Sequence, residues 1–174
     1  MKQKSKLTGW KKYVFNELFL TGAICLLIIV GAKTLNIVRV SGMSMMPTFS
    51  PNELVRTTTN TNNIILDDIV VFDLEEAPGE ERKLIKRVVG LEGDTIQIKN
   101  GELYRNGELV DDNFDSMKNP GIASQTITIP EDEVFVLGDN RNNSNDSRIF
   151  GTVKLKEITN IATGKLLSFE NLKK

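Results

Sequence analysis

Apolar residues follow two different patterns along the chain. Near the N-terminus, "LFLTGAICLLIIVGA", residues 18–32, runs for 15 residues without a charge. Further on, apolar residues come in short β-branched runs that are separated by turn residues. The first pattern is typical of a membrane-spanning helix and the second of a β domain.

The N-terminal run is long enough to cross a bilayer. Counting from Tyr13 gives 20 residues, or about 30 Å of helix. Trp10 and Tyr13 stand where interfacial aromatic residues are expected, and five lysines precede the run. We therefore expect a basic cytoplasmic tail at residues 1–12, a single-pass transmembrane anchor in the cell membrane at 13–33, and an extracytoplasmic domain at 34–174.

Two other interpretations of this run compete with an anchor. A buried core helix would be amphipathic, whereas this run is apolar all round. A cleaved secretory signal would explain the small residues at Val30 to Ala32, which have the right spacing for cleavage. The 15-residue apolar core is at the long end for such a signal. The pattern favours an uncleaved anchor.

The rest of the chain predicts a mainly antiparallel β domain attached to one helix. The runs expected to form strands are residues 34–42, 64–73, 83–91, 94–110, 126–130 and 133–139. Two Asn-Gly pairs, beginning at Asn100 and Asn106, are strong signals for tight hairpins. Residues 75–82 and 111–121 are rich in charged and turn residues and predict exposed loops.

Composition excludes several classes of function. The 174 residues are enough for one domain with a core, and 22 basic against 23 acidic residues give a net charge of −1. A nucleic-acid partner is not expected, because such proteins carry a basic face. The single cysteine, Cys25, lies in the apolar run, so no disulfide framework is expected. The chain has no histidine, which removes Ser-His and Cys-His catalysis and the common zinc sites. Neither a metal nor a cofactor is expected.

A serine surrounded by methionines is the first candidate for chemistry. In "VSGMSMMPT", residues 40–48, Ser44 lies between Met43 and Met45, with Gly42 before it and a proline after it. A glycine beside a turn gives the backbone freedom to present N–H groups to an oxyanion. Taken alone, the stretch favours a strand that ends in a Met-Pro turn. Because histidine is absent, a reactive serine would need Lys, Asp or Glu as its base.

The stretch "KLIKRVVG", residues 83–90, offers such a base. In a strand, Leu84, Lys86 and Val88 share one face, and the opposite face is also largely apolar, so burial on both sides is predicted. Burial disfavours the ammonium form and lowers the pKa of a lysine. Lys83 follows acidic residues and can be solvated. A Lys86 that reaches solvent along its aliphatic stem is the open alternative.

The stretch "GDNRNNSNDSRIFG", residues 138–151, follows an apolar run and predicts a tight polar loop. A calcium loop is excluded because Arg141 takes the third ligand position and Ser144 takes the position of the turn glycine. By itself this segment would be a surface loop.

Together, "SGMSMMPT", "IKRVVGLEGD" and "GDNRNNSNDSR" behind an N-terminal anchor resemble the bacterial type I signal peptidases, in their compact Gram-positive-like form. That family consists of membrane-bound serine endopeptidases with a Ser/Lys dyad and a curled antiparallel β-sheet. They cut exported preproteins after small residues at −1 and −3. The resemblance makes residues 34–174 the catalytic domain and implies Ser44 as nucleophile and Lys86 as general base. It also implies that Ser144 orients the lysine and that Asp146 and Arg148 form a supporting salt bridge.

The resemblance extends over nearly the whole chain and implies that Met45 and Ile85 help to line shallow substrate pockets. The chain departs from the family pattern at Gly42, where some members carry a serine that helps the oxyanion hole. Here that help must come from the backbone, notably from the Ser44 N–H. Asn142 stands where an aspartate is frequent.

Two other classes share parts of this pattern. Self-cleaving SOS-type repressors use a Ser/Lys dyad but carry a DNA-binding domain in place of the anchor. A catalytically silent accessory factor in pilus or surface-protein assembly would bind peptides without cutting them, and the intact Ser44 and Lys86 disfavour it. Twelve residues separate Ala32 from Ser44, at most about 40 Å. The serine is thus kept near the outer membrane face, and the expected partners are exported preproteins and the lipid bilayer.

Overall fold

The computed structural model describes residues 10, 13–26, 36–77, 79–111 and 113–167. The chain divides into two compact units, Met1–Asn36 and Ile37–Lys174.

In the first unit, residues 13–26 form an α-helix that exposes large apolar side chains, among them Phe15, Leu18 and Phe19. No helix among the described residues is both long enough and apolar enough to cross a membrane. The expected anchor extends further than this helix: residues 27–33 lie outside the described residues, and so does the expected tail except for Trp10.

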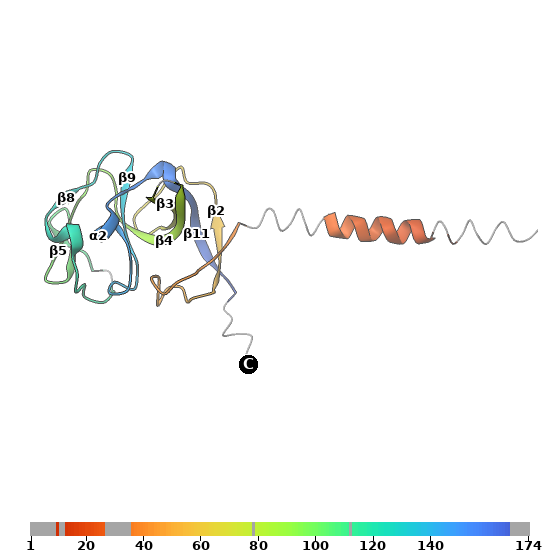
Figure 1. Ribbon diagram of the computed structural model, residues 1–174, viewed down its shortest axis with the longest axis horizontal. Helices are drawn as coiled ribbons and strands as arrows, with labels where there is room; N and C mark the ends of the chain where they lie inside the picture. The colour runs from red at the N-terminus through yellow and green to blue at the C-terminus, as the bar shows by residue number, and fades with distance from the viewer. Residues whose placement is uncertain (1–9, 11–12, 27–35, 78, 112, 168–174) are drawn as a thin grey trace, which may run out of the picture. The chain divides into compact units, whose positions relative to one another are not determined.

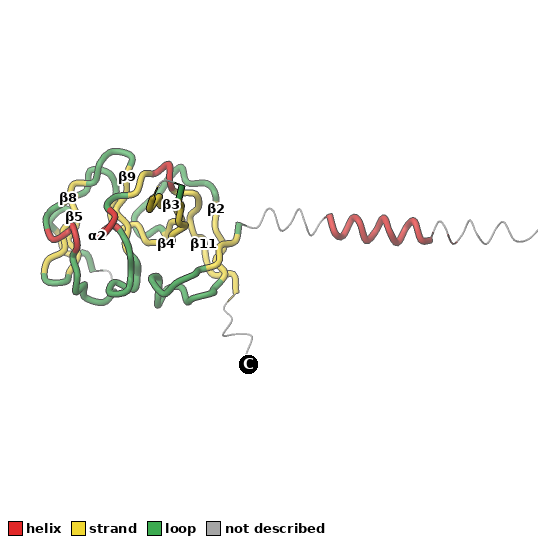
Figure 2. Tube along the Cα trace, viewed as in Figure 1, coloured by secondary structure: helices red, strands yellow, loops and turns green. Residues whose placement is uncertain are grey.

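The second unit is built from short strands joined by turns and loops (Figures 1 and 2). Its strands are β1 (Ile37–Arg39), β2 (Leu54–Thr58), β3 (Ile69–Ala77), β4 (Glu80–Gly90), β5 (Thr95–Lys99), β6 (Glu102–Arg105), β7 (Glu108–Leu109), β8 (Ile127–Thr128), β9 (Glu133–Leu137), β10 (Val153–Lys154) and β11 (Ile158–Leu167). Its helical segments are short: η1 (Gly121–Ser124), α2 (Ser147–Phe150) and η2 (Leu155–Glu157). The prediction of a mainly β unit is confirmed.

The strands form two antiparallel sheets. The first has seven strands in the order β1-β2-β11-β3-β4-β9-β10, and the second has four in the order β7-β6-β5-β8. Every strand pair in both sheets is antiparallel. Both predicted Asn-Gly hairpins are present, because Asn100-Gly101 and Asn106-Gly107 have positive φ at both residues, as a two-residue hairpin turn requires.

Two expectations about strands were wrong. The stretch 75–82, where an exposed loop was expected, contains the end of β3 and the start of β4, with Glu75 opposite Glu81 in their antiparallel pair. Strands β2 and β11 were missed, because their runs mix apolar residues with Thr, Asn, Gly and Lys. Such polar residues are tolerated because they find partners across the pair, as Asn160 Nδ2 does by donating to Thr57 Oγ1 at 3.1 Å.

The core consists of three buried apolar clusters, and strand β9 contributes to two of them. Val134 and Val136 pack with β3, β4, β10 and β11, whereas Phe135 and Leu137 point to the other face and pack with β5 and β6. Strand β4 is shared in the same way, with Val88 in the first cluster and Val89 in the second. The predicted burial of β4 on both faces is confirmed. The third cluster lies under the segment between β1 and β2.

Candidate active site

Ser44 lies in a turn that is closed at both ends. Between β1 and β2, the Val40 N–H donates to the Glu53 carbonyl oxygen at 2.9 Å, and the Asn52 N–H donates back to Val40 at 2.7 Å. Within this loop Met45 is fully buried and packs in the third cluster, whereas Met43 is 52% exposed. Met45 therefore anchors the turn in the core, and this holds the neighbouring Ser44 in place.

Lys86 meets Ser44 from the neighbouring part of the sheet. Its Nζ lies 2.9 Å from Ser44 Oγ and 2.8 Å from the carbonyl oxygen of Ile85, and the residue is only 2% exposed. Lys86 is thus buried rather than extended to solvent. Burial lowers its pKa from 10.5 to about 8, although the carboxylates of Asp146 and Asp139 act in the opposite direction. A lysine with this pKa can release its proton near neutral pH.

A buried carboxylate that the sequence reasoning missed joins all three motifs. Asp139, 3% exposed, accepts two hydrogen bonds from the Arg87 guanidinium, each 2.8 Å long, and a third from the hydroxyl of Thr48. Arg87 follows Lys86 on β4 and Thr48 belongs to the serine turn, so Asp139 holds the two segments together. The available signal was an acidic residue directly after the apolar "EVFVL" run, since a carboxylate there must find a partner.

The third motif contacts the serine turn closely because Gly138 has no side chain. A Cβ at this position would overlap the Ser144 hydroxyl and would lie 2.6 Å from the Ser44 carbonyl oxygen. That carbonyl accepts a hydrogen bond from the Asn140 N–H at 2.9 Å. The Ser144 Oγ is buried and has no hydrogen-bond partner among the described residues. The structure therefore brings Ser144 to the site without a hydrogen bond to Lys86.

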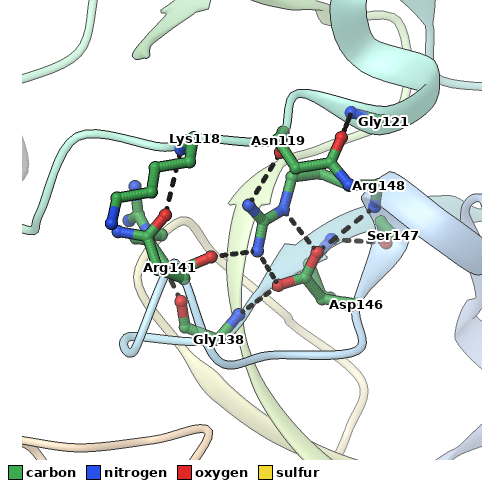
Figure 3. A network of polar contacts seen from close by, with 10 residues as sticks. Lys118, Asn119, Gly121, Gly138, Arg141, Asp146, Ser147 and Arg148 are labelled. Carbon is green, nitrogen blue, oxygen red and sulfur yellow. Dashed lines mark hydrogen bonds and ion pairs between the residues drawn. The ribbon is translucent and has the colours of Figure 1, made fainter.

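Asp146 and Arg148 form the expected ion pair (Figure 3). The guanidinium meets both carboxylate oxygens at 2.8 Å, and both residues are buried. Arg148 also donates to the carbonyl oxygens of Asn119 at 3.1 Å and Arg141 at 2.6 Å, while Asp146 caps α2 and accepts from the Gly138 N–H at 3.1 Å. The pair thus stiffens the loop that carries Ser144.

Ser44 and Lys86 open onto a groove of about 450 Å³. One wall is the 40–44 segment, another is β4 from Arg82 to Lys86, and the 142–145 loop closes it. Ile85 lines the groove, but Met45, which was also expected at the substrate pockets, does not, because its side chain is buried in the core. A larger hollow of about 700 Å³ lies elsewhere, around Arg105, and neither Ser44 nor Lys86 lines it. The reactive pair locates the candidate site in the smaller groove.

One edge of β4 lines this groove and pairs there with no other strand of the described residues. β4 pairs with β3 from Glu80 to Arg87, but it pairs with β9 only from Arg87 onward. Its preceding half therefore offers backbone N–H and C=O groups to an extended peptide. Among the described residues no three His, Cys, Asp or Glu side chains are grouped so that they could hold a metal ion.

Comparisons with known proteins give a consistent family. The family model "Signal peptidase, peptidase S26" matches residues 11–167. The chain is 34% identical to signal peptidase I V of Bacillus subtilis (strain 168) over 160 residues, which is 82% of this chain and 94% of the relative. It is 36% identical to the probable signal peptidase I-1 of Synechocystis sp. over 96 residues, 52% of this chain, and the match spans 48% of that relative.

A solved signal peptidase I from Enterococcus faecalis V583 is 31% identical in sequence to this chain over the aligned residues. That comparison covers 60% of this chain and 97% of the other, with a TM-score of 0.44.

Proposed function

The chain belongs to the signal peptidase family, peptidase S26, and from this premise we propose that it is a membrane-bound serine endopeptidase that removes N-terminal signal peptides from exported preproteins. The observation that carries the proposal is the 2.9 Å contact between Lys86 Nζ and Ser44 Oγ at a buried site. An accessory factor that binds without cutting would have no need of a lysine whose burial lowers its pKa to about 8.

Acylation begins when neutral Lys86 accepts the Ser44 proton as Oγ attacks the carbonyl carbon of the scissile bond. The C–O bond forms and the carbonyl oxygen becomes an oxyanion, for which the Ser44 N–H is the proposed donor. When the intermediate collapses, the C–N bond breaks and Lys86 returns the proton to the leaving amine. The mature protein departs and the signal peptide remains as an ester on Ser44.

Deacylation repeats these steps with water. Lys86 takes a proton from the water as its oxygen attacks the ester carbon, and the proton passes to Ser44 Oγ as the acid is released. Ser144 is the proposed orienting residue, because its buried hydroxyl lies against Gly138 beside the Ser44 carbonyl. The Asp146–Arg148 pair supports the loop that holds it.

The substrate is proposed to bind as an extended strand along the open edge of β4, with the residues before the scissile bond between that edge and the 40–44 segment. Preference for small residues at −1 and −3 follows from the family. Ile85 lines this part of the groove. The seven-stranded sheet, with register shifts in the β2–β11, β11–β3 and β3–β4 pairs, is the proposed counterpart of the family's curled sheet.

Residues 13–33 are proposed as the single membrane anchor, with residues 1–12 in the cytoplasm and 34–174 outside. The charge-free run, the leading lysines and the exposed apolar side chains along residues 13–26 support this arrangement. Protease added to the outside of spheroplasts should digest the catalytic domain, and full protection would contradict the proposed topology.

The function is tested by incubating the detergent-solubilised chain with a preprotein and sequencing any new N-terminus. Cleavage after a small residue at −1 is expected, and the Ser44→Ala variant should leave the preprotein whole. Binding without any cleavage by the unaltered chain would favour the accessory factor instead.

A further inference from the structure

A second hollow adjoins the catalytic groove. It has a volume of about 340 Å³ and shares two lining residues, Asn142 and Ser144, with the groove that holds the Ser44–Lys86 pair. Its other walls include Lys118 and Ile149. A peptide in the groove that continues past Ser144 would therefore enter this hollow, which we call the Lys118 pocket.

The wall that carries Lys118 is fixed to the loop of Ser144. The Lys118 N–H donates to Asn142 Oδ1 at 2.9 Å, and Asn142 Nδ2 donates to the Ser116 carbonyl oxygen at 3.0 Å. Arg148 binds the same segment through the Asn119 carbonyl oxygen (Figure 3). An aspartate at position 142 could accept the first of these bonds but could not donate the second. Asn142 therefore holds the pocket wall through two hydrogen bonds, one to Ser116 and one to Lys118, so the pocket is already formed without a ligand.

The charge of the pocket is positive. Lys118 is exposed, and its ammonium group makes no ion pair or hydrogen bond within the described part of the chain. None of the described residues lining the pocket carries a carboxylate, because Asp146 is buried behind Arg148. Ile149, 61% exposed, adds apolar surface for a side-chain stem. A carboxylate on a short aliphatic stem fits these surroundings best.

The direction of the peptide follows from the reaction. Lys86 must hand its proton to the leaving amine, so the chain beyond the scissile bond departs on the side of its ammonium group. Residues before the bond are proposed to occupy the open edge of β4. The Ser144 side chain lies against Gly138 beside Ser44 and lines both the groove and the Lys118 pocket. The Lys118 pocket is thus next to the first residues of the mature protein.

We propose that the Lys118 pocket binds a side chain among the first three residues after the scissile bond and favours a carboxylate there. The inference rests on the proposed function and adds a substrate preference to it.

The test uses the full chain in detergent micelles and preprotein peptides that are identical except for Glu, Gln or Lys at one of these three positions. At one position kcat/KM should fall in the order Glu, Gln, Lys, by about twofold to fivefold for each step, the range expected for a partly solvated ion pair. This order should weaken in about 1 M salt. Lys118→Gln should remove the order and Lys118→Glu should reverse it.

The matched control is Lys156→Glu, which makes the same change at an exposed lysine lining neither hollow and should keep the original order. Equal cleavage of all peptides by the unaltered chain, or an order that survives in Lys118→Glu, would overturn the pocket while leaving the peptidase intact. If the unaltered chain cut none of the peptides, the proposed function and the pocket would both be overturned.

Discussion

Strand β4 carries two lysines, and the surroundings of the two are opposite. Lys83 is 52% exposed and pairs with Asp73 at 2.9 Å. Lys86 is 2% exposed, and its ammonium contacts the neutral Ser44 hydroxyl and Ile85 carbonyl. Three positions along one strand therefore separate a structural cation from a candidate base.

The difference shows that burial next to neutral partners outweighs more distant charge. Asp146 and Asp139 favour the ammonium form of Lys86, yet desolvation is the larger effect and brings its pKa to about 8. At pH 7 about one in ten Lys86 side chains is then neutral, against about one in three thousand for an ordinary lysine. The fold makes the base by burying the lysine side chain beside neutral partners.

The largest expected effect comes from Lys86→Arg. Arginine keeps the positive charge and most of the length, but its guanidinium stays protonated at any useful pH and cannot accept the Ser44 proton. Cleavage of a preprotein should fall by about a thousandfold or more. Folding is checked by thermal melting. A folded and active variant would mean that the base lies elsewhere.

Lys83→Arg is the control for this experiment. The change is chemically identical and lies three positions earlier, where an exposed arginine can still pair with Asp73. Activity should stay within about twofold of the unaltered chain, since exposed ion pairs contribute little.

The second comparison concerns ion pairs at buried and exposed sites. Arg148→Ala would leave Asp146 charged in the interior and would remove the bonds to Asn119 and Arg141. The free energy of unfolding should fall by about 3–5 kcal/mol, measured by denaturant titration. Asp73→Asn, at the exposed pair, should cost less than about 0.5 kcal/mol. Equal losses in the two variants would show that burial does not distinguish these pairs.

The pH profile sharpens the comparison between the two lysines. Only neutral Lys86 can accept a proton, so kcat/KM should rise by about fiftyfold from pH 6 to pH 8 and level off above its pKa of about 8. Arg82 lowers this pKa through its positive charge, so Arg82→Gln should move the midpoint upward. Lys83→Ala should leave it in place. A midpoint near 10 for the unaltered chain would contradict a buried base.

Local sequence patterns predicted much of this architecture. The Asn-Gly hairpins are local signals, and the burial of β4 follows from apolar residues on both of its faces. Lys86 and Ser44 were assigned through the three motifs together, since each motif alone fits a structural explanation at least as well. The contact between Lys86 and Ser44 joins residues 42 positions apart, so no single stretch of sequence contains it.

Long-range packing accounts for what the sequence did not reveal. Met45 was expected in the substrate groove. Which of the three nearby methionines turns inward depends on packing with Val40, Phe49 and Val55, and these partners are brought together only in the fold. Asp139 binds Arg87 and Thr48, which are 52 and 91 positions away in the sequence. Gly138 lies against Ser144, on the other side of the polar loop. Such contacts require the folded sheet before they can be seen.

The smallest predicted effects come from replacing two glycines near Ser44 by alanine. Gly138→Ala places a methyl group onto the Ser144 hydroxyl and 2.6 Å from the Ser44 carbonyl oxygen, at a buried position. Overpacking there should cost about 1–3 kcal/mol of stability and should also reduce cleavage, because the loop must move away from the serine turn.

Gly42→Ala is the matched change on the open side of the same turn, where a Cβ meets nothing within 4 Å and φ does not require glycine. Its stability should stay within about 0.5 kcal/mol of the unaltered chain. Denaturant titration and preprotein cleavage on both variants measure the contrast, and a silent Gly138→Ala would show that the third motif does not need its close approach to Ser44.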